Sequence, residues 1–150
     1  MIIPILTSII IIICLIYLKA TKKLKNNTIL GLLVLIGILL TMIYGMKQPD
    51  ISKNTDSIII NGPYGYTLAL NDIINISLSN ELPKDYIRTN GFGFGEQEQG
   101  EFKTRDGIKF RLYLQKKSEP PYIKIEADNG NVYINCNSKV ETEELYNNLK

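Results

Sequence analysis

Two long apolar runs near the N-terminus constrain the fold of this chain more than any other feature. Residues 1–18 and 28–46 contain no charged side chain. As α-helices rising about 1.5 Å per residue, they would reach roughly 27–29 Å, close to the ~30 Å hydrocarbon core of a bilayer. A helix is also the state in which a single segment pairs its own backbone polar groups in lipid. The sequence therefore predicts two transmembrane helices.

A basic segment, residues 19–27, separates the two runs. Its lysines are Lys19, Lys22, Lys23 and Lys25. A lysine at the centre of a bilayer costs roughly 2.5–3.5 kcal/mol, so the segment predicts a loop between two helices. Lysines favour the cytoplasmic side, and only Lys47 and Lys53 follow the second run closely. We therefore expect a multi-pass protein of the cell membrane, with the loop inside and the C-terminal part outside.

Each apolar run has an alternative interpretation. A cleaved signal peptide carries positive charge before its apolar core and a small-residue cleavage site after it, whereas the charge here comes after residues 1–18. In the second run, Gly37, Thr41 and Gly45 are spaced four residues apart, and small residues at that spacing permit close helix packing. We interpret them as a contact with the first helix rather than a seam between two copies of the chain.

The rest of the chain carries a nearly balanced charge. Of the 17 basic residues, the four lysines of the loop precede residue 47, which leaves 13 against all 15 acidic residues, a net charge of 13 − 15 = −2. A nucleic-acid-binding domain would present a strongly positive face, so we expect no nucleic-acid partner. The sequence has no histidine, and its two cysteines, Cys14 and Cys136, fall in unlike parts. We therefore expect no disulfide, no metal site and no cofactor.

After a polar segment at 47–56, which reads as a linker, the hydrophobic period changes to two. The alternating apolar positions are Leu68, Leu70, Ile74, Ile76, Leu78, Ile108, Phe110, Leu112, Leu114, Ile123, Ile125, Val132, Ile134 and Cys136. Each run predicts a strand with one buried and one wet face. The tripeptides "RDG" at 105–107 and "DNG" at 128–130 predict hairpin turns. Residues 57–150 therefore predict a small antiparallel β sandwich or barrel.

The end of the chain has the pattern of a helix. Residues 138–150, "SKVETEELYNNLK", place Leu145 and Leu149 on one helical face. Ser138 followed by Glu141 fits a capping box, with Thr142 as an alternative start. The fold class expected for the whole chain is α+β and mainly β, with a transmembrane helical hairpin before the β domain and a helix closing it.

The stretch "NGFGFGEQEQG", residues 90–100, is the one candidate for a phosphate-binding loop. Gly95 and Gly100 have the spacing of a Walker loop, but Glu101 and Phe102 follow in place of Lys and Ser or Thr. We interpret the glycines instead as relief of crowding where a strand bends or bulges. Phe92 and Phe94 then share one face, as core residues or as the lip of a groove.

Five segments together carry a resemblance to a known family. They are "INGPYGYTLALNDIINISL", "YIRTNGFGFGEQEQGEF", "DGIKFRLYL", "YIKIEADNGNVYINC" and "ETEELYNNL". They resemble the bacterial pleckstrin-homology-like (PH-like) domain, in particular the kind that follows two membrane spans. The resemblance implies two packed antiparallel sheets closed by a C-terminal helix, and little about activity. Eukaryotic relatives in fold often bind phosphoinositides through a basic first hairpin, but residues 58–70 contain no Lys or Arg.

These observations favour a membrane-anchored, non-catalytic interaction module that binds a protein or peptide through a sheet edge or groove. The candidate binding residues are Arg88, Phe92, Phe94, Lys109, Arg111 and Lys124. Three tyrosines at strand positions predicted to face outward, Tyr113, Tyr122 and Tyr133, could add contact surface. The alternative is a binder of lipid headgroups or envelope polymer through outward lysines and arginines. An enzyme is a further alternative, although the sequence has no nucleophile elbow and no histidine to activate a nucleophile, so we expect no catalytic residues.

Overall fold

The computed structural model describes residues 13, 16–17, 20 and 26–150. The chain divides into two compact units, Met1–Tyr44 and Gly45–Lys150. The larger unit holds every strand of the described residues, and it is the unit on which the functional argument rests.

The predicted transmembrane hairpin is not supported by the structure. Helix α2 (Asn26–Gly45) covers most of the second predicted span, 28–46. Within the described residues, no helix combines the length and the hydrophobicity that a membrane span requires. The prediction is therefore wrong for these residues.

The other predicted elements of that hairpin lie largely outside the described residues. Most of the first predicted span, residues 1–18, and nearly all of the basic loop, residues 19–27, lie outside the described residues. The predicted orientation in the cell membrane depended on both spans and stays a prediction.

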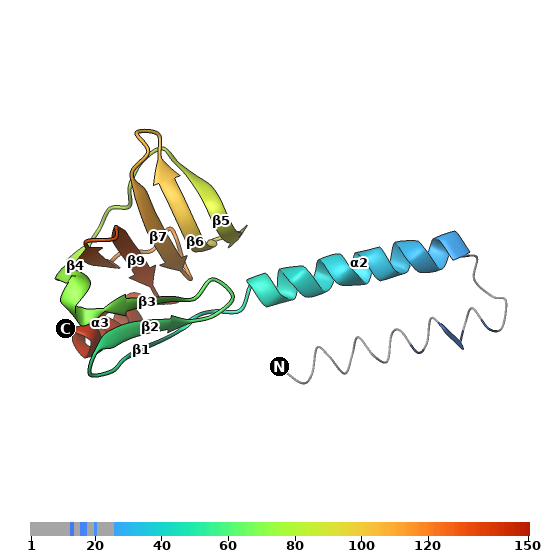
Figure 1. Ribbon diagram of the computed structural model, residues 1–150, viewed down its shortest axis with the longest axis horizontal. Coiled ribbons are helices and arrows are strands. Elements are labelled where there is room, and N and C mark those ends of the chain that lie inside the picture. The colour runs from blue at the N-terminus through green and yellow to red at the C-terminus, as the bar shows by residue number, and fades with distance from the viewer. Residues whose placement is uncertain (1–12, 14–15, 18–19, 21–25) are drawn as a thin grey trace. The chain divides into compact units, whose positions relative to one another are not determined.

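The unit Gly45–Lys150 contains nine strands and a C-terminal helix (Figure 1). The strands and the one short 3-10 helix are β1 (Asp50–Lys53), β2 (Ser57–Asn61), β3 (Tyr66–Ala69), η1 (Leu70–Asp72), β4 (Ile73–Ser79), β5 (Tyr86–Phe94), β6 (Gln97–Thr104), β7 (Lys109–Leu114), β8 (Tyr122–Ala127) and β9 (Asn131–Asn135). Strands β1-β2-β3 form one sheet, and β4-β8-β9-β7-β6-β5 form the other. The chain ends in helix α3 (Lys139–Leu149). The prediction of a β-rich domain closed by a C-terminal helix is confirmed.

Two features of the sheets differ from the prediction. Strands β7 and β9 pair in parallel, with Leu112 beside Tyr133, whereas we expected antiparallel pairing throughout. Segment 47–56, interpreted as a linker, contains β1, which pairs with β2. Ile51 is the one apolar residue of β1 and packs on the core. One apolar side chain in four residues is too short a pattern to reveal a strand by its period.

The core has two parts because buried side chains lie on both faces of the six-stranded sheet. The first is built from Ile58, Ile60, Leu68, Tyr113, Ile123, Ile125, Ala127, Val132, Ile134 and Leu149. The second is built from Phe102, Phe110, Leu112, Leu114, Tyr122 and Tyr133. The tyrosines predicted to be exposed, Tyr113, Tyr122 and Tyr133, are only 2%, 5% and 7% exposed. The prediction assumed that each strand has one solvent-exposed face, whereas both faces of these strands carry buried side chains.

The predicted turns and helix cap are confirmed. Gly107 and Gly130 have φ of +85° and +108°, and their N–H groups donate to the carbonyls of Thr104 and Ala127. The Ser138 hydroxyl accepts a hydrogen bond from the N–H of Glu141 at 3.3 Å and so caps α3. These contacts are local in sequence, which is why residue type alone predicted them.

Residues 90–100 lie in the β5–β6 hairpin, where the interpretation of the glycines as relief of crowding holds for Gly91 but not for Gly95, which lies in the turn. The register shifts between Arg88 and Asn90, which marks a bulge in β5. Gly95, with φ of +58°, begins the two-residue turn between the strands. Gly91 and Gly100 are paired across the hairpin, and a Cβ on either would overlap the backbone of the other strand. The two strands therefore approach each other there without side chains between them.

Candidate functional site

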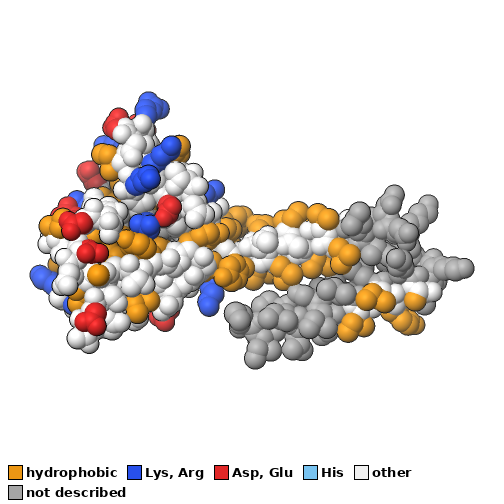
Figure 2. Space-filling model, in the orientation of Figure 1, with side chains coloured by type: hydrophobic (Ala, Val, Ile, Leu, Met, Phe, Trp, Pro, Cys, Tyr) orange, Lys and Arg blue, Asp and Glu red, His pale blue; other side chains and the backbone are white. Residues whose placement is uncertain are grey.

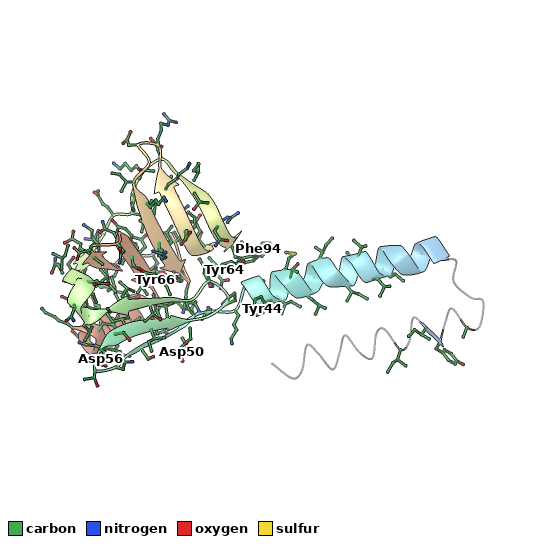
Figure 3. The ribbon with its side chains drawn as sticks, in the orientation of Figure 1. Tyr44, Asp50, Asp56, Tyr64, Tyr66 and Phe94 are labelled. Carbon is green, nitrogen blue, oxygen red and sulfur yellow. The ribbon has the colours of Figure 1, made fainter. Side chains whose placement is uncertain are left out.

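A cleft of about 210 Å³ lies between the β2–β3 turn and the strands β5, β6 and β7. Its lining residues are Pro63, Tyr64, Gly65, Tyr66, Asn90, Gly100, Glu101 and Arg111. We call it the Tyr66–Arg111 cleft. Figure 3 labels Tyr64 in the β2–β3 turn, Tyr66 at the start of β3, and Phe94 at the end of β5. The cleft is therefore assembled from both sheets of the unit.

Arg111 is held in a defined position at the cleft. Its Nη2 lies 2.7 Å from Oε1 of Glu101, the residue opposite it on β6. The guanidinium carbon lies 3.7 Å from the centre of the Tyr66 ring, which is a cation–π contact. The Arg111 side chain is 23% exposed and that of Glu101 is 48% exposed. The ring and the carboxylate together orient a guanidinium that solvent or a ligand can still reach.

The other wall of the cleft is fixed by a buried hydroxyl. Tyr113 Oη donates a hydrogen bond to the backbone carbonyl of Tyr64 at 2.7 Å. Burial is the main cause that raises the pKa of Tyr113, so the phenol remains protonated and keeps this donor. The turn is further closed by the N–H of Gly65, which donates to the carbonyl of Gly62. The Tyr64–Tyr66 wall is thus tied to β7 as well as to its own sheet.

The floor of the cleft reaches the free edge of the six-stranded sheet. Asn90 on β5, Glu101 on β6 and Arg111 on β7 form one row across the three strands. Strand β5 is the last strand of this sheet and pairs only with β6 (Figure 1). Because Asn90 belongs to both the edge strand and the cleft lining, the cleft extends to the edge.

Apolar side chains continue along the same face of β5. Phe92 and Phe94 are paired with Gln99 and Gln97, which follow Glu101 on its face of β6. Phe92 is half-buried and packs over Gly45. Phe94 is 54% exposed. The free edge therefore offers a polar cleft at Asn90 and an exposed aromatic ring four residues further on.

The structure brings together three of the six candidate binding residues named from the sequence. Phe92 and Phe94 lie on one face of β5, and Arg111 lines the adjoining cleft. Arg88 also lies on β5, but it is paired with Phe102 and therefore belongs to the opposite face. Lys109 lies on β7 opposite Lys103, beyond the cleft lining.

Lys124 lies apart from these residues. In the register of β8, β9 and β7, Lys124 shares a face with Tyr133 and Leu112, the face opposite to that of Arg111. Its Nζ is also paired with Glu126 on its own strand. The sequence predicted that both Lys124 and Arg111 face outward, but they lie on opposite faces of the sheet.

Sequence reasoning identified only Arg111 in the cleft lining and missed its four other polar or aromatic side chains, Tyr64, Tyr66, Asn90 and Glu101. The hairpin turn at 105–107 contained a signal for one of them, because antiparallel pairing around that turn places Glu101 opposite Arg111. The two tyrosines had no such signal, since they reach the site through packing between separate sheets.

The comparisons with known proteins add no identity to this geometry. No family model, no curated protein and no solved structure matches the chain. The function therefore has to be argued from the site itself.

The chemistry of the site follows from the side chains that line it. The cleft lining contains no serine, cysteine, lysine or histidine. Among the described residues, no group of His, Cys, Asp and Glu is placed to hold a metal ion. Burial raises the pKa of the Cys136 thiol, which lowers the fraction of reactive thiolate. The cleft itself presents an arginine, a carboxylate, an amide and two aromatic rings.

Proposed function

We propose that the unit Gly45–Lys150 is a non-catalytic binding module that takes up an extended segment of a protein partner along the free edge of β5. The observation that carries the proposal is the continuity of this edge with the Tyr66–Arg111 cleft through Asn90. In strand addition, main-chain hydrogen bonds supply affinity and pockets for alternate side chains supply specificity.

The pleat of β5 defines where a bound segment would place its side chains. Alternate residues of an added strand face the same side of the sheet. A side chain beside Asn90 would therefore lie at the mouth of the cleft, and the next two on that side would lie beside Phe92 and Phe94. The bulge at 88–90 and the charge of Arg88 are features by which natural edges resist pairing. The open part of the edge is therefore Asn90–Phe94.

The charges of the unit argue against an anionic lipid or polymer as the main ligand. On the face shown in Figure 2, Lys and Arg side chains are interspersed with Asp and Glu over the β-rich unit. Five basic side chains are each within ion-pair distance of a glutamate, namely Arg111, Lys116, Lys117, Lys124 and Lys139. A surface neutralised in this way attracts phosphate groups weakly.

The proposal includes the resemblance of this unit to the bacterial PH-like domain. A β body followed by a helix laid on the core, through Leu149, supports it. The parallel pairing of β7 and β9 departs from the purely antiparallel sheets that the resemblance implies.

The test is a selection of random twelve-residue peptides displayed on phage against the full chain, followed by titration of an enriched peptide into ¹⁵N-labelled protein. We expect amide shifts along Asn90–Phe94 and at Gly100. Phe94→Asp should weaken binding about tenfold, because it removes an exposed aromatic contact.

The matched control is Ile74→Asp, because Ile74 is 71% exposed on β4, the opposite edge of the same sheet. The control should leave affinity unchanged. Shifts that map to β4, a loss of binding in the control variant, or a selection that enriches no peptide would each overturn the proposal.

A further inference from the structure

The Tyr66–Arg111 cleft is electrically neutral although it contains two charges. Arg111 and Glu101 are the only charged residues that line it, and they are paired with each other. A charged ligand group would be attracted by one partner and repelled by the other. Displacing Glu101 or Arg111 would also leave a partly buried charge without its partner, which is costly.

Both members of the pair retain hydrogen-bonding capacity. Their contact joins Nη2 of Arg111 to Oε1 of Glu101, with no second side-chain bond to either group among the described residues. A guanidinium has five N–H donors, and a carboxylate has about four acceptor positions. The cleft therefore presents unused donors and unused acceptors side by side.

The volume of the cleft sets the size of what it can hold. Small-molecule and cofactor sites usually measure about 300–1,000 Å³, and this cleft measures about 210 Å³. It suits one side chain better than a cofactor. The Asn90 side chain and the residues Tyr64 and Tyr66 complete a lining that is both polar and aromatic.

We infer that the cleft recognises an uncharged carboxamide, the side chain of a glutamine or asparagine in the bound segment. The carboxamide oxygen accepts a hydrogen bond from Arg111, and its NH₂ group donates to Glu101. No other common side chain supplies a carbonyl acceptor and two N–H donors without a net charge. This inference rests on the proposed peptide-binding function for the source of the amide.

The test uses three small probes that differ in one side chain: the N-acetyl, N′-methylamide derivatives of glutamine, glutamate and lysine. Each is titrated into the ¹⁵N-labelled full chain while the amides of Asn90 and Gly100 are observed. The glutamine probe should bind roughly threefold to tenfold more tightly than the other two, the range expected for one or two well-placed hydrogen bonds. Tighter binding of the glutamate or lysine probe, or no shift at these amides with any probe, would overturn the inference.

Two variants should reverse the preference. Glu101→Gln leaves Arg111 without its counter-charge, so the glutamate probe should become the tightest ligand. Arg111→Gln leaves Glu101 unpaired, so the lysine probe should become the tightest. Glu101→Gln is isosteric at a half-exposed position, so it provides the test even if loss of the Arg111 packing on Tyr66 unfolds the other variant. An unchanged order of probes in Glu101→Gln would contradict the inference.

The probes also separate this inference from the proposed function. They are too short to add a strand to β5, and Phe94→Asp should not change their affinity. If the enriched peptides fail to map to β5 while the probe order holds, strand addition is wrong and carboxamide recognition stands. If the peptides bind β5 but show no preference for glutamine or asparagine beside Asn90, carboxamide recognition is wrong and strand addition stands.

Discussion

Tyr86 shows how one side chain can connect neighbouring parts of the sheet. Its hydroxyl donates to Oε2 of Glu98 at 2.6 Å, and Nζ of Lys117 lies 3.1 Å from Oε1 of the same carboxylate. Its ring also makes edge contacts with Phe102 and Phe110 in the second part of the core. Burial, followed by the hydrogen bond to Glu98, raises the pKa of Tyr86 to about 12 from its ordinary value of 10.0.

This shift predicts a loss of stability at high pH. The folded protein holds the Tyr86 proton more tightly than the unfolded chain, so the contribution is complete below about pH 10 and is lost as pH rises through about 12. Urea denaturation of the full chain at these pH values should show that the unfolding free energy falls as pH rises. The fall should be smaller in Tyr86→Phe than in the unmodified protein, by about 1–2 kcal/mol after allowance for solvent screening. Equal falls in the two proteins would contradict the assignment.

At the scale of single elements, the β5–β6 hairpin depends on glycine for two different reasons. Gly91 and Gly100 have φ of +140° and +115°, and each also lies against the backbone of the facing strand. Gly95 has φ of +58°, but a Cβ there would meet no atom within 4 Å. The first two positions therefore require glycine for space as well as conformation, and the third for conformation alone.

Alanine substitutions should separate these two reasons. Gly100→Ala should lower the unfolding free energy by about 3 kcal/mol or more, because backbone strain and overlap with Asn90 add together. Gly95→Ala should lower it by only about 1–2 kcal/mol. Urea denaturation of both variants measures the difference. If the two substitutions lower the unfolding free energy equally, overlap with the facing strand adds no cost at Gly100.

For the whole molecule, both parts of the hydrophobic core lie within Gly45–Lys150. The segment that begins this unit contributes to it directly. Gly45 lies against Phe92, and the carbonyl of Lys47 accepts a hydrogen bond from Nε2 of the buried Gln99 at 3.2 Å. Lys53 on β1 donates to the carbonyl of Leu149 at the end of α3. Residues 45–53 are thus part of the folded body.

Two fragments test where the folded unit begins. Residues 45–150 should fold alone, with a β-rich circular dichroism spectrum and one cooperative urea transition, because they contain both parts of the core formed by the described residues. Residues 57–150, the boundary suggested by the sequence, should be several kcal/mol less stable, since they lose β1 and leave the Gln99 amide without its acceptor. A fragment 57–150 as stable as 45–150 would show that residues 45–56 add nothing to the fold.

Local signals in the sequence predicted the features whose partners are close along the chain. The turns at 105–107 and 128–130, the cap at Ser138 and the irregular strand around Gly91 all depend on contacts a few residues apart. Residue type is enough for such features, because backbone conformation and short hydrogen bonds are set locally. The two apolar runs were equally clear as a pattern, but the span inferred from residues 28–46 is not supported by the helix that forms there.

Patterns within short segments of the chain are therefore enough to predict a β-rich body with its turns and its closing helix. Three features depend instead on how distant segments pack: the burial of both strand faces, the parallel pairing of β7 and β9, and the contact of Tyr66 with Arg111 across two sheets. The period of a strand distinguishes its two faces but does not say what covers each of them. The candidate site depends on that missing information, because Tyr66 and Arg111 are brought together by the packing of elements far apart in the chain.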